Sequence, residues 1–182
     1  MTVLLRGGRV VDPQTGLDEV IDVLIKGDSI AEVGADLEAP KGATIVECAS
    51  KVVMPGLVDI HTHLREPGRE DEETVRSGTR AAAHGGYTAV CPMPNTSPVC
   101  DTGSAVRFIV ERAAEEGAVR VWPVGSLTTG QRGESIAEMG DMVAEGAVGF
   151  SDDGRDVQDS GMMRRVMAVS YTHLTLPTTP YV

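Results

Sequence analysis

The feature that most constrains the fold is a regular alternation of short apolar runs and longer amphipathic stretches after Gly56. We predict strands at residues 57–60, 87–91, 119–124 and 147–150, and helices at residues 74–84, 104–116, 134–145 and 159–168. Strands that alternate with helices at this spacing form a parallel sheet. Parallel strands are normally buried on both faces, which suits their continuous apolar character. This part of the chain is therefore predicted to have an α/β fold.

Glycine and polar residues mark the expected helix ends. Gly85 follows the first predicted helix and Gly117 follows the second, as expected for residues that stop a helix. Either Asp101 or Thr102 can cap the start of the second helix, because both carry a side-chain oxygen that can accept a hydrogen bond from the first turn.

The first 53 residues have a different pattern. Short β-prone runs are separated by turn signals that contain glycine, proline and aspartate, and the runs cover residues 3–5, 9–11, 20–25, 29–33 and 44–47. This pattern predicts a small antiparallel sheet module that precedes the strand–helix alternation.

Polar side chains follow several of the predicted parallel strands. These are His61, His63 and Arg65 after the first strand, Asn95 after the second, and Asp152 and Asp153 after the fourth. Barrel enzymes and doubly wound sheets place their sites at this end of the strands. The two histidines on the first strand favour a barrel.

His61 and His63 are two residues apart, and side chains two apart on a strand point to the same face. Both imidazoles can therefore reach one point, as a metal ion requires. Arg65 adds a fixed positive charge beside that point. The pattern suggests a hydrolase that acts on a small anionic substrate, and the alternative is a pair of strand histidines in ordinary hydrogen bonds.

Composition excludes several other classes of protein. The 182 residues suffice for one ordinary domain, and 41% are hydrophobic, so a core is expected. The net charge of -11 argues against a nucleic-acid partner, whose phosphates require basic patches. No apolar run approaches the ~20 residues that span a bilayer, and no signal peptide is recognisable, so we expect a cytoplasmic protein. The odd, widely spaced cysteines (Cys48, Cys91 and Cys100) indicate reduced thiols.

Three motifs carry a family resemblance. Residues 58–68 (Val-Asp-Ile-His-Thr-His-Leu-Arg-Glu-Pro-Gly) resemble the signature of dihydroorotase in the amidohydrolase superfamily. Residues 93–96 and 150–154 resemble two further motifs of its bacterial class I form, and the resemblance covers essentially residues 1–168. It implies zinc-dependent, reversible interconversion of dihydroorotate and N-carbamoyl-L-aspartate in pyrimidine biosynthesis. The fold it implies is a (β/α)8 TIM barrel with a small β-sandwich built from both chain ends.

The resemblance also implies a domain division. Residues 1–53 would be the N-terminal part of the β-sandwich, and residues 54–168 would be the first half of the barrel, with about four βα units. Residues 169–182 resemble the translated read-through of a sequencing adapter, although a natural Thr/Pro-rich terminus is the alternative. If that tail is foreign, His173 is not a ligand. We then expect the family's catalytic aspartate and remaining histidine ligands to be absent and the fragment to be inactive.

The resemblance assigns roles to five side chains. His61 and His63 resemble the first two zinc ligands, and Asp153 resembles the carboxylate that binds one zinc ion or bridges two. His63, Arg65 and Asn95 resemble contacts to the substrate. The remaining interpretations are structural: an Asp-Gly turn at Asp153, an ion pair of Arg65 with a nearby glutamate (Glu66 or Glu70), and a turn after Pro94.

Two acidic residues have open roles. Asp152 competes with its neighbour Asp153 as the metal ligand, because the sequence alone does not separate adjacent carboxylates. Asp59 either orients a histidine ligand or caps a turn.

Two other functions fit the same pattern. The first is a related cyclic amidohydrolase such as allantoinase, hydantoinase or dihydropyrimidinase, and Arg65 argues for an acidic pyrimidine precursor instead. The second is a non-catalytic, dihydroorotase-like partner of aspartate transcarbamoylase. Association with that enzyme and homo-oligomer formation both remain open at this point.

Overall fold

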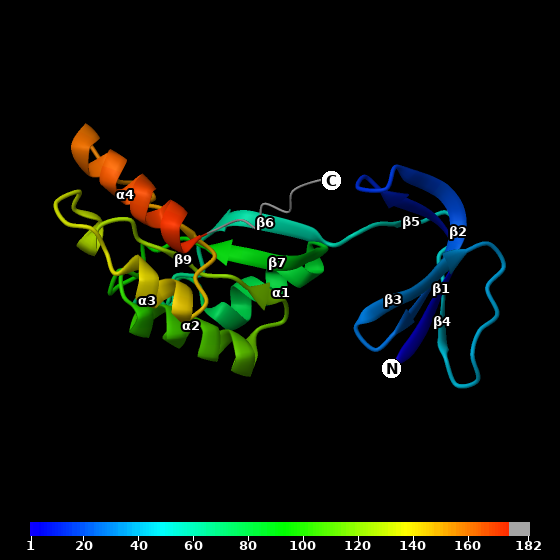
Figure 1. The fold of residues 1–182 in the computed structure, drawn as a ribbon. Coiled ribbons are helices and arrows are strands. Elements are labelled where there is room, and N and C mark those ends of the chain that lie inside the picture. The colour runs from blue at the N-terminus through cyan, green and yellow to red at the C-terminus, as the bar shows by residue number, and fades with distance from the viewer. Residues whose placement is uncertain (175–182) are drawn as a thin grey trace. The chain divides into compact units, whose positions relative to one another are not determined.

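The computed structural model describes residues 1–174 and divides into two compact units (Figure 1). The first unit is Met1–Pro55 and the second begins at Gly56, close to the boundary predicted after residue 53. Each unit is described by itself below.

The first unit is one mixed sheet. Its strands are β1 (Thr2–Asp12), β2 (Leu17–Lys26), β3 (Ser29–Gly34), β4 (Thr44–Glu47) and β5 (Val52–Val53). The order is β3-β2-β1-β4, with β5 also paired to β1. β1, β2 and β3 pair in antiparallel fashion, but β4 and β5 run parallel to β1. The prediction of an antiparallel module is therefore wrong for these two strands, because the chain crosses to the far side of β1 after β3.

The predicted runs at residues 3–5 and 9–11 are one strand with a register shift between Leu5 and Gly8. At the shift, Gly7 has a φ of 67°, and its backbone nitrogen donates to Oδ1 of the buried Asp22 at 2.7 Å. A Cβ atom on Gly8 would lie 2.6 Å from Val53 Cγ2, so only glycine fits there. This close approach allows β5 to pair beside β1.

The second unit contains the predicted strand–helix alternation, and its strand pairs are parallel as predicted. The elements in order are β6 (Leu57–Thr62), α1 (Val75–His84), β7 (Tyr87–Pro92), α2 (Gly103–Glu116), β8 (Arg120–Val121), β9 (Val124–Gly125), η1 (Thr129–Gln131), α3 (Met139–Ala144), β10 (Gly149–Phe150) and α4 (Ser160–His173). One sheet has the order β6-β7-β8, and a second pairs β10 with β9. Helices α1 and α2 lie along one side of β6 and β7 (Figure 1).

The helix starts follow from their capping residues. Thr74 and Ser77 form a capping box at α1, and the Thr102 side chain accepts a hydrogen bond from the backbone nitrogen of Ala105 at the start of α2. Of the two predicted caps, Thr102 is therefore the one used. Asp159 caps α4 in the same way, through the backbone nitrogen of Met162.

The third predicted strand is broken in two. β8 pairs with β7 and β9 pairs with β10, and Trp122 and Pro123 lie between them. Proline has no N–H to donate to a neighbouring strand, so the ladder is interrupted there. The backbone nitrogen of Val148 still donates to the Pro123 carbonyl, which keeps β10 aligned with this run.

The third predicted helix is much shorter than predicted. α3 begins at Met139, and residues 134–138 instead continue a loop that contains η1. The backbone nitrogen of Ala137 donates to the Leu127 carbonyl, and Thr128 forms an isolated bridge with Ile136. These contacts within the loop override the local helical pattern.

α4 continues past residue 168 to His173, so the predicted boundary of the tail does not coincide with a helix end. Val169 packs against the core beside α4's buried Val166. Residues 175–182, the rest of the predicted tail, lie outside the described residues. The foreign origin of the tail remains a prediction.

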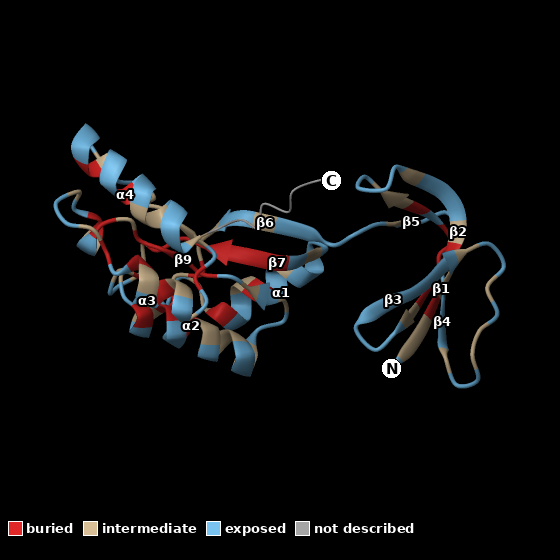
Figure 2. Cartoon of the chain, in the orientation of Figure 1, coloured by how far each residue is buried: buried red, intermediate tan, exposed pale blue. Residues whose placement is uncertain are grey.

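The main core of the second unit lies between α2, α3 and α4, where Val106, Ile109, Met139, Met142 and Val166 are buried together. Burying each such side chain contributes about 1.5–3 kcal/mol. β7 is buried along most of its length, whereas β6 at the end of the sheet is largely exposed (Figure 2). The core thus holds the helices against β7 and leaves β6 as an open edge strand.

Two further features bear on the class of protein. No helix in residues 1–174 is long and apolar enough to cross a lipid bilayer. The three cysteines are buried free thiols.

Candidate metal centre

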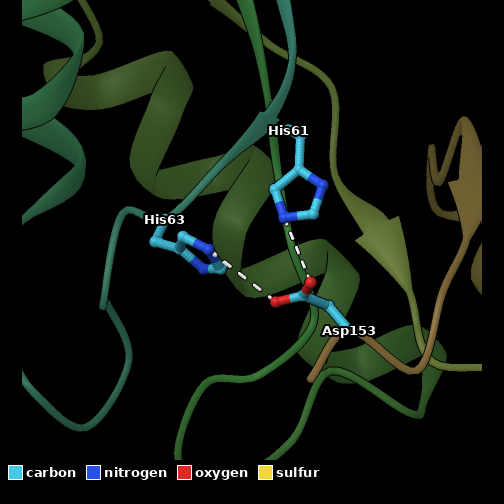
Figure 3. A group of neighbouring side chains, drawn as sticks. All are labelled: His61, His63 and Asp153. Carbon is cyan, nitrogen blue, oxygen red and sulfur yellow. Dashed lines mark ion pairs between the residues drawn. The ribbon is translucent and has the colours of Figure 1, made fainter. Parts of the chain in front are cut away.

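Three side chains from distant parts of the second unit meet at one point (Figure 3). His61 lies at the end of β6, His63 follows that strand, and Asp153 follows β10. His61 Nε2 lies 3.1 Å from Asp153 Oδ1, and His63 Nε2 lies 3.7 Å from Asp153 Oδ2. One ligand atom from each residue lies within 4.8 Å of the other two, a spacing that a single cation can share.

The strand places the two imidazoles side by side. Their ring centroids are 5.5 Å apart and the ring planes meet at 71°. The backbone nitrogen of His61 donates to Asp59 Oδ1 at 3.0 Å, which is a local contact inside strand β6. Because the strand continues through both residues, Asp59 does not cap a turn, and its role in orienting a histidine ligand stays a prediction.

Asp152 and Asp153 occupy different environments. Asp152 is buried, and its Oδ1 accepts from Ser126 Oγ and from the backbone nitrogens of Leu127 and Thr128 at 2.7–3.1 Å. Its Oδ2 accepts from the Thr128 hydroxyl. These four donors occupy Asp152, whereas Asp153 faces the histidines. Of the two candidates, Asp153 is therefore the one that lies beside both imidazoles.

Asn95 lies between His63 and Asp153. Its Oδ1 is 3.0 Å from His63 Nδ1, and its Nδ2 donates to Asp153 Oδ2 at 3.0 Å. The residue follows β7, so three separate strand ends contribute to the cluster. Sequence reasoning placed Asn95 against the substrate and missed its contacts with both of these side chains.

The structure does not bring Arg65 into this cluster. Arg65 has a left-handed backbone with a φ of 59°, and its Nε lies 3.6 Å from Oε2 of Glu72. The predicted alternative, an ion pair of Arg65 with a nearby glutamate, is thus found, but the partner is Glu72 and not Glu66 or Glu70.

Glu66 has a structural role that the sequence analysis missed. It is buried, and its Oε2 accepts from the backbone nitrogen of Val75 at 2.8 Å, which satisfies the first turn of α1. Its Oε1 accepts from Arg112 Nε on α2 at 2.9 Å. The hydrogen bond to Glu66 raises the pKa of the Arg112 guanidinium.

The loops after β6 and β7 are tied together beside the cluster. The backbone nitrogen of Ser97 donates to the Pro67 carbonyl at 3.0 Å. Gly68 has a φ of 101°, and a Cβ atom there would lie 2.0 Å from the Ser97 carbonyl oxygen. Its backbone nitrogen donates to Glu70, which lowers the pKa of that carboxyl group. The glycine of the Arg-Glu-Pro-Gly motif therefore allows the two loops to approach.

The hydrogen-bond partners of Asp152 have a signal in the sequence. Ser126 and Thr128 follow a predicted strand at the same edge as the histidines, and their hydroxyls are the natural partners of a buried carboxylate. The partnership of Glu66 with Arg112 had no such signal, because the two residues lie 46 positions apart.

The family assignment follows from comparison with known proteins. The family model described as dihydro-orotase-like (DHOase) matches residues 50–176. The chain belongs to this dihydro-orotase-like family. The family resemblance identified from the sequence motifs is thereby confirmed.

Curated relatives agree with the family assignment. A dihydroorotase of Geobacter sulfurreducens is 51% identical over 167 residues, which cover 92% of this chain and 39% of that relative. A dihydroorotase of Pelotomaculum thermopropionicum is also 51% identical, with the same coverage. The chain thus spans about two fifths of the length of these relatives.

Solved structures show the same fold. An L-hydantoinase (dihydropyrimidinase) of Arthrobacter aurescens matches with a TM-score of 0.75 and 26% identity over 90% of this chain and 37% of that chain. A dihydroorotase structure matches with a TM-score of 0.63 and 19% identity, over 94% of this chain and 48% of that chain. These matches confirm the predicted α/β class, with the second unit as part of a TIM barrel.

Proposed function

We propose that this chain is the N-terminal part of a zinc-dependent dihydroorotase that interconverts (S)-dihydroorotate and N-carbamoyl-L-aspartate in pyrimidine biosynthesis. The observation that supports this most strongly is the meeting of His61, His63 and Asp153 at the carboxyl ends of parallel strands. This is the edge where barrel enzymes carry their active sites.

The donor set fits zinc. Two imidazole nitrogens and one carboxylate oxygen are ligands that zinc prefers, and three protein ligands leave room for a reacting group. Bound zinc would polarise the amide carbonyl of the substrate and lower the pKa of a coordinated water molecule. Asp153 offers one oxygen to each histidine side, which suits binding of one ion or bridging of two.

We further propose that Arg65 contacts the substrate carboxylate. The partner of Arg65 in the structure is Glu72, whose side chain is 40% exposed. An exposed ion pair of this kind contributes only about 0–1 kcal/mol. A substrate carboxylate can therefore replace Glu72, and it would gain the paired hydrogen bonds that a guanidinium offers and lysine does not.

The metal assignment is tested by titrating the 182-residue chain with Zn²⁺ in isothermal titration calorimetry. We expect His61→Asn and Asp153→Asn to weaken binding at least about tenfold, because each removes one of three ligands. His84→Asn is the matched control, since His84 lies on α1 outside the cluster. Failure of the unmodified chain to bind Zn²⁺ would contradict the proposal and favour the non-catalytic role beside aspartate transcarbamoylase.

The reaction is tested in a protein in which residues 1–168 are completed by the C-terminal portion of the Geobacter sulfurreducens relative. We expect turnover of dihydroorotate, followed by its ultraviolet absorbance, and a raised KM with unchanged zinc content in Arg65→Lys. Turnover of hydantoin or allantoin without dihydroorotate would support the runner-up cyclic amidohydrolase instead. That alternative is favoured by the likeness to the L-hydantoinase structure.

Four expectations accompany this proposal. The 182-residue chain alone should show no turnover, and measurable turnover by the pure chain would overturn that expectation. A cytoplasmic location remains a prediction. Self-association and association with aspartate transcarbamoylase also remain predictions.

A further inference from the structure

The Asn95 side chain makes two hydrogen bonds, and both go to the proposed metal ligands. One joins Asn95 Oδ1 to His63 Nδ1 and the other joins Asn95 Nδ2 to Asp153 Oδ2, each at 3.0 Å. Both are partly buried, and they join residues 32 and 58 positions apart in the chain. One short amide therefore connects side chains that follow β6 and β10.

Hydrogen-bond chemistry fixes the direction of these contacts. An ionised carboxylate only accepts, so the amide NH2 group of Asn95 must face Asp153. The amide oxygen then faces His63 Nδ1, and because that oxygen also only accepts, Nδ1 must carry the proton. In a neutral imidazole with its one ring proton on Nδ1, the nitrogen with the free lone pair is Nε2. This nitrogen lies 3.7 Å from Asp153 Oδ2, on the side where a cation would be shared.

We propose that Asn95 is a positioning residue that holds His63 in the Nδ1–H tautomer and aims its Nε2 lone pair at the cation shared with Asp153. The part that concerns the cation rests on the proposed function, whereas the tautomer is a property of the metal-free protein. Outer partners of this kind orient metal ligands, and their loss typically weakens metal binding about 10- to 100-fold.

The loop that carries Asn95 is built to hold it. Pro94 is fully buried, and its carbonyl accepts from the backbone nitrogen of Cys100 at 2.9 Å. On the other side, Thr96 Oγ1 donates to the Pro98 carbonyl at 2.7 Å. The amide is thus presented from a backbone that is fixed on both sides, as a positioning role requires.

This role differs from the substrate contact inferred from the sequence. In the structure, the oxygen and the nitrogen of the Asn95 amide each have a partner within the cluster. A substrate group that bound Asn95 would share or break one of these hydrogen bonds. Substitution of Asn95 should therefore change metal binding even when no substrate is present.

The test is an NMR measurement on the metal-free 182-residue chain with ¹⁵N-labelled histidine at pH 8. Two-bond ¹H–¹⁵N correlations report which ring nitrogen is protonated, and His63→Asn identifies the His63 signals. We expect the Nδ1–H tautomer for His63. Asn95→Leu, which keeps the branched shape but has no hydrogen bonds, should shift His63 toward the Nε2–H form that a free histidine side chain prefers. The His84 signals should not change and serve as the internal control.

Asn95→Asp separates the two contacts of the amide. An aspartate oxygen can still accept from His63 Nδ1–H, so the tautomer should be retained, whereas the donor to Asp153 is lost. Zn²⁺ affinity, measured by competition with a chelator, should fall about 10- to 100-fold in Asn95→Leu. Far-UV circular dichroism of each variant checks that the chain has kept its fold.

The outcomes distinguish this proposal from the proposed function. An Nε2–H tautomer in the unmodified chain would overturn the role of Asn95 regardless of how the variants behave. Equal tautomers and equal Zn²⁺ affinities in the unmodified chain and Asn95→Leu would also overturn it, while zinc binding itself would stand. Absence of Zn²⁺ binding in the unmodified chain would instead contradict the proposed function.

Discussion

Asp152 Oδ1 lies 2.7 Å from Ser126 Oγ, and this buried hydrogen bond ties the segment that carries Asp153 to the loop after β9. The neighbouring carboxylate of Asp153 meets His61 Nε2 at 3.1 Å. Two adjacent aspartates therefore have different partners: Asp152 accepts hydrogen bonds from the loop after β9, and Asp153 faces the imidazoles.

An aspartate-to-asparagine substitution is therefore predicted to affect stability at one position and Zn²⁺ binding at the other. Asp152→Asn should lower the free energy of unfolding by about 1–3 kcal/mol, because it turns an amide NH2 group toward buried donors. Asp153→Asn should leave the stability of the metal-free chain nearly unchanged and should weaken Zn²⁺ binding. Urea unfolding measures the first effect and titration calorimetry the second. Equal loss of stability in both variants would show that this prediction is wrong.

Glu66 is predicted to stabilise the packing of α1 against α2. Glu66→Gln should lower the free energy of unfolding by about 1–3 kcal/mol, because it removes a buried charge that accepts from Val75 and from Arg112. Thermal and urea unfolding provide the measurement.

The control for that experiment uses the same arginine. Glu115 Oε2 lies 3.3 Å from Arg112 Nη1, but its side chain is 65% exposed. Glu115→Gln should therefore change stability by less than about 1 kcal/mol, as for most exposed ion pairs. If both substitutions lower the free energy of unfolding equally, burial of Glu66 does not strengthen its contact with Arg112.

The exposed edge strand β6 predicts self-association of the chain. Ile60 is 75% exposed on this strand, which lies at the end of the sheet order β6-β7-β8. Open apolar edges pair with other chains, and an edge lysine prevents this. Ile60→Lys should therefore increase the monomer fraction in size-exclusion chromatography with light scattering, without lowering the melting temperature.

Met167→Lys is the matched control for the edge. Met167 is 62% exposed but lies on helix α4, which has no strand edge to pair with another chain. This substitution should leave the association state as it is in the unmodified chain. If Met167→Lys also increases the monomer fraction, general surface apolarity drives association and the edge does not.

The buried thiols predict slow alkylation. Burial raises the pKa of the Cys100 thiol to about 12, and burial, followed by the charge of Asp59, raises the pKa of the Cys91 thiol. Because the thiolate is the reactive form, iodoacetamide at pH 8 should modify these cysteines slowly in the native chain and rapidly in urea, as measured by mass spectrometry. Rapid modification of Cys100 without urea would contradict its burial.

The same shift has a consequence for stability. A thiol with a raised pKa in the folded state favours folding fully below its unfolded pKa, near 9. That contribution is lost as the pH rises through the folded value of about 12, because the unfolded chain alone can release the proton. Unfolding should therefore become easier between these values, and Cys100→Ala should reduce that part of the dependence on pH.

The sequence alone determined the parallel strand–helix order of the second unit, the glycines that end its first two helices, and the residue types that meet at His61, His63 and Asp153. These follow from local rules: apolar periodicity marks strands, glycine stops helices, and side chains two positions apart on a strand point to the same face. His61 and His63 could be predicted in this way because they are separated by one residue at the end of a single strand.

Only the tertiary structure decided which aspartate faces the histidines, which carboxylate pairs with Arg65, and how Asn95 is engaged. Each depends on contacts between residues far apart in the chain, such as Asp152 with Ser126 and Asn95 with Asp153. The short α3 and the parallel β4 have the same origin, since loop hydrogen bonds and a crossing connection override local preference. A hydrogen bond has a donor and an acceptor at defined positions, and the fold alone brings such distant groups together.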